Sequence, residues 1–107
     1  MYLKIHNKKY EVKEYKKFKE RFSSLKFYLN PVDFVLYFPN KKFLNTNFFC
    51  QRVDACFTDK DYKILYIFSN VKSEKRILRL KSKHLFIMPI DTSKHLKIGD
   101  VLKIEEK

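Results

Sequence analysis

Short apolar runs separated by proline, asparagine, aspartate and serine fill residues 31–104 and limit the folds open to this chain. None of these runs is longer than five residues, and residues 64–68 form one of that length. Runs this short, bounded by turn-forming residues, are typical of β-strands. A membrane-spanning helix needs about 20 apolar residues. The sequence therefore predicts a mainly β fold and no transmembrane segment.

Alternating and apolar patterns predict where the strands lie. We expect strands at residues 3–6, 34–38, 53–58, 63–68, 78–81, 85–88 and 101–104, and a turn at residues 7–9. Asp59 and Asp61 separate two of these segments, and aspartate side chains bond to the backbone in tight turns. This predicts a hairpin over residues 53–68. The chain has one glycine, Gly99, which excludes a glycine-rich phosphate loop or a dinucleotide-binding fingerprint.

A helical period precedes Pro31. Tyr15, Phe18 and Phe22 recur at three- and four-residue spacing, which predicts an amphipathic helix over residues 11–22. Near the other end, residues 91–93 are of helix-capping types and predict a short helical turn. We therefore expect one α+β, mainly β domain over residues 1–107. Its strands would form a small half-open β-barrel or rolled antiparallel sheet, with one N-terminal amphipathic helix and a short C-terminal helical turn.

Charge is unevenly distributed along the chain. Basic residues outnumber acidic ones by 24 to 12, for a net charge of +12. Residues 1–30 carry nine basic and three acidic groups, residues 31–71 five and four, and residues 72–107 ten and five. A basic surface suits nucleic acid or an acidic protein partner. A compositional bias explains the same excess, because Lys, Asn, Phe, Tyr and Ile are all abundant, so both explanations stay open.

Several segments carry a resemblance to a known family. Residues 53–65, V-D-A-C-F-T-D-K-D-Y-K-I-L, resemble the I-D-x-x-F-L-D-x-x-x-x-V-x hairpin of the domain of unknown function 192 family. Residues 34–39 stand where that family has G-M-L-F-x-F-P, and residues 45–54 match its H-T-F-F-M-R-F-P-I-D segment without a gap. Residues 85–89 and 96–100 are similar to its V-L-E-L-P-A-G and G-I-K-V-G-D.

This resemblance covers residues 15–104 and implies a divergent member of the family with the family's fold. Some family positions differ here: the His, Met, Arg and Pro of the central segment are Asn45, Phe49, Cys50 and Arg52, and the late Glu and Gly are Ile87 and Asp91. If the replaced residues form a site in the family, that site is altered in this chain. The family has no established activity, so the resemblance implies a fold and little mechanism.

Asp54 is the sharpest candidate for a polar site, because it lies between Val53 and Ala55 in an apolar segment. A buried carboxylate must accept hydrogen bonds or shift its pKa. It would then either tie down a neighbouring loop, near Thr46 or Arg52, or act as a general acid or base. The candidate polar site is therefore Thr46, Arg52 and Asp54, and no catalytic residue is assigned.

Residues 72–83 are the most basic stretch, with six basic groups and one acidic group. The candidate anion-binding side chains are Lys72, Lys75, Arg76, Arg79, Lys81 and Lys83. Such a row would follow a phosphate backbone, with nearby aromatic faces for stacking. An ordinary solvated face explains the same residues, because no nucleic-acid-binding signature is present.

The histidines and cysteines do not indicate a metal site. His6, His84 and His95 lack ligand spacing, and Cys50 and Cys56 form no C-x-x-C pair, so we expect neither a metal nor a cofactor. The cysteines are expected to be reduced, partly buried thiols. The N-terminus lacks the apolar core of a signal peptide, and we expect a cytoplasmic protein.

These patterns favour a non-enzymatic binding or interaction module whose ligand and oligomeric state the sequence does not name. Two alternatives stay open. One is electrostatic binding of nucleic acid, and the other is a small hydrolase-like or ligand-processing site around Asp54.

Overall fold

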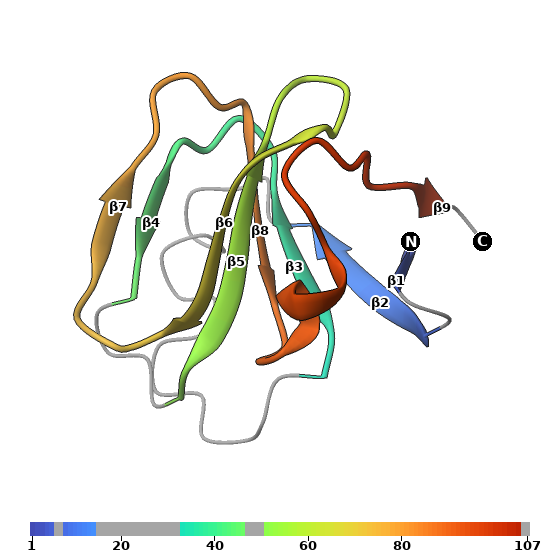
Figure 1. The fold of residues 1–107 in the computed structure, drawn as a ribbon, viewed down its shortest axis with the longest axis horizontal. Helices are drawn as coiled ribbons and strands as arrows, with labels where there is room; N and C mark the ends of the chain where they lie inside the picture. Colours follow the sequence, from blue (N-terminus) through green and yellow to red (C-terminus); the bar gives the residue numbers. More distant parts are fainter. Residues whose placement is uncertain (6–7, 15–32, 47–50, 106–107) are drawn as a thin grey trace.

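The computed structural model describes residues 1–5, 8–14, 33–46 and 51–105 (Figure 1). The described elements are β1 (Tyr2–Ile5), β2 (Lys8–Glu14), β3 (Val35–Phe38), β4 (Phe43–Asn45), β5 (Val53–Thr58), β6 (Ile64–Val71), β7 (Arg76–Leu78), β8 (His84–Met88), the 3-10 helix η1 (Thr92–His95) and β9 (Ile104–Glu105). Within these residues, no helix is long and apolar enough to cross a membrane.

Seven strands form one mixed sheet in the order β6-β5-β8-β3-β2-β1-β9. Most neighbours are antiparallel, but β2 and β3 are parallel, with Val12 paired to Val35. The expectation of a purely antiparallel sheet is therefore wrong. The described strands form an open sheet that ends at β6 and β9, and they do not close into a barrel. Figure 1 shows β1, β2 and β9 at one end of the molecule and the separate β4–β7 pair at the other.

The central strands are mostly apolar, and both faces of the sheet are covered there. In β8, Leu85 and Ile87 belong to one core, whereas Phe86 and Met88 belong to the other. This follows from the two-residue period of a strand, which sends neighbouring side chains to opposite faces. A strand covered on both faces is typically a nearly continuous apolar run, and β3, β5 and β8 are buried along their whole length, including the polar Asp54, Thr58 and His84.

The β4–β7 pair covers one face of the main sheet. Leu44 of β4 is buried in the same core as Leu85 and Ile87, and Ile77 of β7 packs against that core. Leu44 pairs with Ile77 in the two-stranded ladder. The two strands therefore bring residues 72–83, which flank β7, next to the main sheet. The strand expected over residues 78–81 is instead β7, which ends at Leu78.

The hairpin expected from residues 53–68 is confirmed as β5 and β6. The Asp59 carboxylate accepts hydrogen bonds from the backbone N–H groups of Asp61 and Lys63, at 2.9 and 3.0 Å. Those donors, Lys63 first, lower the pKa of Asp59. The short C-terminal helical turn is also confirmed as η1, although Asp91 makes no side-chain cap bond.

Several expected elements differ at the termini. Residues 11–14, expected to begin a helix, belong to β2, and residues 15–22 of that expected helix lie outside the described residues. In β2, Val12 is buried while its neighbours Glu11 and Lys13 are exposed, so this segment alternates as a strand does. Lys8 and Lys9, expected in a turn, pair with Ile5 and Lys4 of β1. The last strand is shortened to β9, and Val101 makes only an isolated bridge to Lys63.

Candidate functional site

Thr46 lies at the end of β4 and is fully buried. Its hydroxyl donates a hydrogen bond to the Lys72 carbonyl at 2.7 Å and accepts one from the Lys75 backbone N–H at 2.8 Å. Its own backbone N–H donates to the Lys75 carbonyl at 2.9 Å, and its carbonyl accepts from Glu74 at 3.3 Å. Thr46 therefore fixes the connection between β6 and β7 by four hydrogen bonds.

Asp54 is also fully buried, in the middle of β5. One carboxylate oxygen accepts a hydrogen bond from the Asn70 backbone N–H at 2.8 Å. The other accepts from the backbone N–H and the hydroxyl of Ser93, at 2.8 and 2.7 Å. The Ser93 hydroxyl lies 2.7 Å from that of Ser69. Because the Ser93 hydrogen points to Asp54, Ser69 donates to Ser93, and the chain of hydroxyls leads from the carboxylate to the surface.

These contacts place Thr46 and Asp54 at the two ends of residues 69–75, a segment that comprises the end of β6 and its connection to β7. Asp54 holds its first part at Asn70, and Thr46 holds its second part at Lys72 and Lys75. The segment contains two left-handed residues, Asn70 and Glu74, with φ of 55° and 62°. Such backbone conformations persist where the surrounding structure holds them. The loop-tethering hypothesis for Asp54 is thus the one that the contacts support.

Arg52 does not join this arrangement. It is exposed, and no hydrogen bond or ion pair within the described chain links it to Asp54 or Thr46. The partners that matter are Ser93 and Asn70, which sequence reasoning missed because they lie 39 and 16 positions from Asp54. The sequence indicates that a buried aspartate needs hydrogen-bond donors, but it does not indicate which residues supply them.

Residues 69–75, which Thr46 and Asp54 hold by hydrogen bonds and which we call the clamped segment, form one wall of a hollow of about 390 Å³. We call this cavity the β6–β7 hollow. Its lining residues are Ile67, Phe68, Ser69, Asn70, Val71, Lys72, Lys75 and Ile77. Four of these are apolar, two carry a neutral polar side chain and two are lysines. No acidic residue lines it.

The six candidate anion-binding residues lie on β7 and its two connections. Arg76 is in β7, and the others flank it. Within the described part of the chain, no ion pair engages Lys72, Lys75, Arg76, Lys81 or Lys83; the pair formed there is Lys9–Glu105, at 3.9 Å.

Arg79 is held differently from the other basic residues. Its guanidinium lies over the rings of Phe68 and Tyr66 of β6, 5.0 and 5.2 Å from their centroids. It also donates to the Leu78 carbonyl at 2.8 Å. Cation–π contacts of this kind fix the guanidinium beside the strand. Phe68 therefore contacts Arg79 and also lines the β6–β7 hollow.

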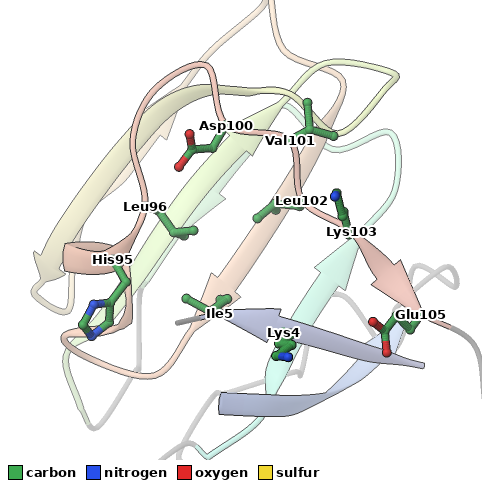
Figure 2. Close-up of a pocket in the computed structure, with 9 residues that line it drawn as sticks. All are labelled: Lys4, Ile5, His95, Leu96, Asp100, Val101, Leu102, Lys103 and Glu105. Carbon is green, nitrogen blue, oxygen red and sulfur yellow. The ribbon is translucent and has the colours of Figure 1, made fainter. Parts of the chain in front are cut away.

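A second hollow, of about 470 Å³, lies between β1 and the C-terminal segment (Figure 2). Figure 2 shows Ile5, Leu96 and Leu102 in its middle, with polar and charged side chains around them. Its remaining lining residues are Lys4, His95, Asp100, Val101, Lys103 and Glu105. Unlike the β6–β7 hollow, it is therefore lined by carboxylates as well as lysines.

An aromatic cluster surrounds His84, which is 8% exposed. The His84 ring stacks on Tyr62 with centroids 5.2 Å apart and meets Tyr37 edge-on at 5.5 Å. The Asn40 backbone N–H donates to His84 Nδ1 at 3.2 Å. Burial lowers the pKa of His84, with a further contribution from the charge of Lys83. Burial and the hydrogen bond with Tyr62 raise the pKa of Tyr37.

Cys56 is a free, fully buried thiol, and burial raises its pKa to about 12. A thiol in that state is a poor nucleophile, because the thiolate is the reactive form. Cys50 lies outside the described residues. In the described ranges, no three His, Cys, Asp or Glu side chains are grouped so that they could hold a metal ion.

Comparison with known proteins gives the fold and no name. No protein-family model and no curated protein matches the chain. A protein of unknown function from Novosphingobium aromaticivorans is similar in structure, with a TM-score of 0.79, 12% sequence identity, and 96% of this chain and 82% of that chain covered. A putative transcription regulator from Sinorhizobium meliloti has the same TM-score and 16% identity, with 95% and 89% covered. At such identities the likeness shows the fold alone.

Proposed function

We propose that this protein is a non-enzymatic binding module that takes an anionic ligand at the β6–β7 hollow. One observation carries the proposal: two buried polar residues, Thr46 and Asp54, fix the segment that presents Lys72 and Lys75 at the hollow. Neither lysine is engaged by a carboxylate of the described chain. Two cations on a fixed backbone, neither paired with a carboxylate of the described residues, attract an anion.

The clamped backbone reduces the cost of binding. Ordering one residue costs roughly 1–2 kcal/mol of conformational entropy. Here the segment is held before any ligand arrives, by hydrogen bonds from Thr46 and Asp54. Only the lysine side chains would need to be ordered. Preorganisation of this kind increases affinity without any additional contact.

A hydrolase-like role for Asp54 has less support. Its two oxygens already accept three hydrogen bonds, and none of its surface is exposed. A general base must reach a substrate proton directly or through one water. Asp54 reaches the surface only through two serine hydroxyls, Ser93 and Ser69. The geometry therefore favours a positioning role.

Nucleic acid is a second candidate ligand, favoured by the six basic residues that flank and include β7. The similar Sinorhizobium meliloti protein is described as a putative transcription regulator, which makes nucleic acid a natural polymer to test. Binding of labelled dT12 between 50 and 200 mM NaCl would test it. A log–log slope of several units is expected if phosphates are neutralised, and a slope near zero contradicts this candidate.

The proposed anion site is tested by ¹⁵N NMR titration of the whole chain with citrate and, separately, with dT12. At least one anion should shift amides of residues 69–77, and Lys72→Gln/Lys75→Gln should reduce the affinity about tenfold. The matched control is Lys94→Gln/Lys97→Gln, which removes the same charge from exposed positions elsewhere. If neither citrate nor dT12 shifts these amides, and octanoate does not shift them in the titration described in the next subsection, the proposal is wrong.

We further propose that the chain is a divergent member of the domain of unknown function 192 family. The support is that the resembling segments coincide with neighbouring strands of the main sheet: residues 34–39 contain β3, residues 53–65 contain β5 and the turn after it, and residues 85–89 contain most of β8. Superposition on a solved member of that family tests it. The hairpin and the Gly99 turn should coincide in register, and a one-residue offset between the hairpins would contradict membership.

A further inference from the structure

We infer that the ligand of the β6–β7 hollow is a small carboxylate with an apolar body, because the same cavity is lined by apolar side chains and by two lysines that no carboxylate of the described residues pairs with. This inference rests on the proposed function and names its ligand class. The apolar body would contact Phe68, Val71 and Ile77, which pack with one core, whereas the Ile67 side chain packs against the core on the other face of the sheet. The carboxylate would lie between Lys72 and Lys75.

The apolar part of the hollow comes from two strands. Ile67, Phe68 and Val71 belong to β6, and Ile77 belongs to β7. Phe68, Val71 and Ile77 also pack with the core beneath them, so their positions are fixed. The volume of about 390 Å³ falls in the range of roughly 300–1,000 Å³ typical of small-molecule sites. An inorganic anion would leave these apolar surfaces in contact with water.

The charged part of the hollow is all cationic. Lys72 and Lys75 lie on either side of Glu74, but Glu74 is exposed and is not a lining residue. Ser69 and Asn70 add a hydroxyl and an amide. Because the Ser69 hydrogen is donated to Ser93, the Ser69 oxygen offers no donor to a ligand. Recognition of a carboxylate would therefore depend on the two lysines and the Asn70 amide.

The second hollow provides an internal comparison. It has a similar volume and also contains two lysines, Lys4 and Lys103, with Ile5, Leu96 and Leu102 among its lining (Figure 2). Asp100 and Glu105 also line this hollow, and their negative charges oppose the entry of an anion. The two hollows thus share an apolar component and differ in net charge. An apolar anion should select the β6–β7 hollow.

A chain-length series tests the inference. Butanoate, hexanoate and octanoate, each below its micellar concentration, are titrated into the ¹⁵N-labelled chain, and amide shifts at residues 67–77 give the Kd. Each methylene moved from water into an apolar site is expected to strengthen binding about fourfold, until the hollow is filled. Heptylamine has the same heptyl chain as octanoate with a positive charge, and it should not shift these amides.

Variants assign the site. Lys72→Gln/Lys75→Gln should weaken octanoate binding about tenfold, whereas Lys4→Gln/Lys103→Gln should change it less than twofold. All four lysines are exposed, so the folded state should tolerate both changes. Affinity that does not depend on chain length, or that follows the Lys4 and Lys103 pair, would overturn the inference. If citrate or dT12 binds at the hollow and the alkanoates do not, the proposed function stands and this inference fails.

Discussion

Asp54 links three elements of the chain through one buried carboxylate. It belongs to β5, it accepts a backbone N–H from Asn70 of β6, and it accepts two bonds from Ser93 of η1. Hydrogen bonds to charged groups contribute roughly 1.5–3 kcal/mol each, and a buried donor left without its acceptor is costly. Loss of the Asp54 carboxylate is therefore expected to lower the free energy of unfolding substantially, because three hydrogen bonds depend on this one side chain.

Asp54→Asn should destabilise the protein by about 2 kcal/mol, because the amide replaces one acceptor with a donor that faces another donor. The melting temperature should fall by about 10 °C for a chain of this size. Asp91→Asn is the matched control, because Asp91 is exposed and makes no side-chain cap bond. Equal melting temperatures for the two variants would show that Asp54 is not a tether.

His84 should make stability depend on pH. Burial lowers its pKa in the folded state, whereas the unfolded chain takes up a proton near pH 6.5. The unfolded state therefore binds more protons below that pH, and the stabilisation present above about 6.5 is lost as the pH falls through the lowered pKa. Urea midpoints measured at pH 7.5, 6.5 and 5.5 should decrease in that order.

The contribution of His84 is isolated by variants. His84→Gln should flatten the pH dependence between 7.5 and 5.5, whereas His95→Gln, a change at an exposed position, should leave it in place. An equal slope in wild type and His84→Gln would mean that another group titrates. The Asn40 N–H bond to Nδ1 supports this expectation, because that nitrogen is unprotonated in the folded state.

At the scale of elements, the β6–β7 connection depends on a residue that lies outside it. Thr46 follows β4, yet its hydroxyl bonds to Lys72 and Lys75, 26 and 29 positions later. The ladder between β4 and β7 brings it there, since Asn45 pairs with Arg76. The β4–β7 sheet therefore covers the core and also positions Thr46, whose hydrogen bonds fix the backbone that lines the β6–β7 hollow.

Thr46→Val should loosen this connection specifically. The substitution keeps the shape but removes the hydroxyl, leaving the Lys75 N–H without its acceptor, at a cost of about 1–3 kcal/mol. Hydrogen exchange at the Lys75 amide should become at least about tenfold faster, and octanoate binding should weaken. Thr58→Val is the control, because that hydroxyl donates to the Asp59 carbonyl instead. Unchanged exchange at Lys75 in Thr46→Val would contradict the clamp.

Elements also differ in how far the sequence predicts them. Strands β3, β5 and β8 follow from mostly apolar runs, since each is buried on both faces and has no alternation of apolar and exposed polar residues. Residues 11–14 were expected to be helical because aromatic residues follow at helical spacing, yet β2 pairs them with β1 and β3. Here Glu11 pairs with β1 and residues 12–14 pair with β3, and this cross-strand pairing stabilises an extended backbone more than local propensity favours a helix.

At the scale of the whole molecule, a net charge of +12 acts on a small chain with a radius of gyration of 12.6 Å. Charges this close repel one another, and salt screens them over a distance that shortens from about 20 Å at 20 mM to about 7 Å at 200 mM. Raising NaCl from 20 to 200 mM should therefore increase the melting temperature by several degrees.

Charge reversal provides the check on this effect. Lys94→Glu/Lys97→Glu changes two exposed positions away from the β6–β7 hollow and lowers the net charge. Its melting temperature should depend less on NaCl than that of the wild type. A wild-type melting temperature that does not change with salt would show that repulsion contributes nothing to stability.

The sequence by itself determined the strand-rich architecture, the β5–β6 hairpin and the need of a buried Asp54 for hydrogen-bond donors. These depend on local periodicity, on turn chemistry and on the cost of burying a carboxylate, and residues close together in the sequence determine all three. The tertiary structure decided the parallel β2–β3 pair, the choice of Ser93 and Asn70 as donors, and the clamp from Thr46. Those depend on register between distant segments, which no local pattern encodes.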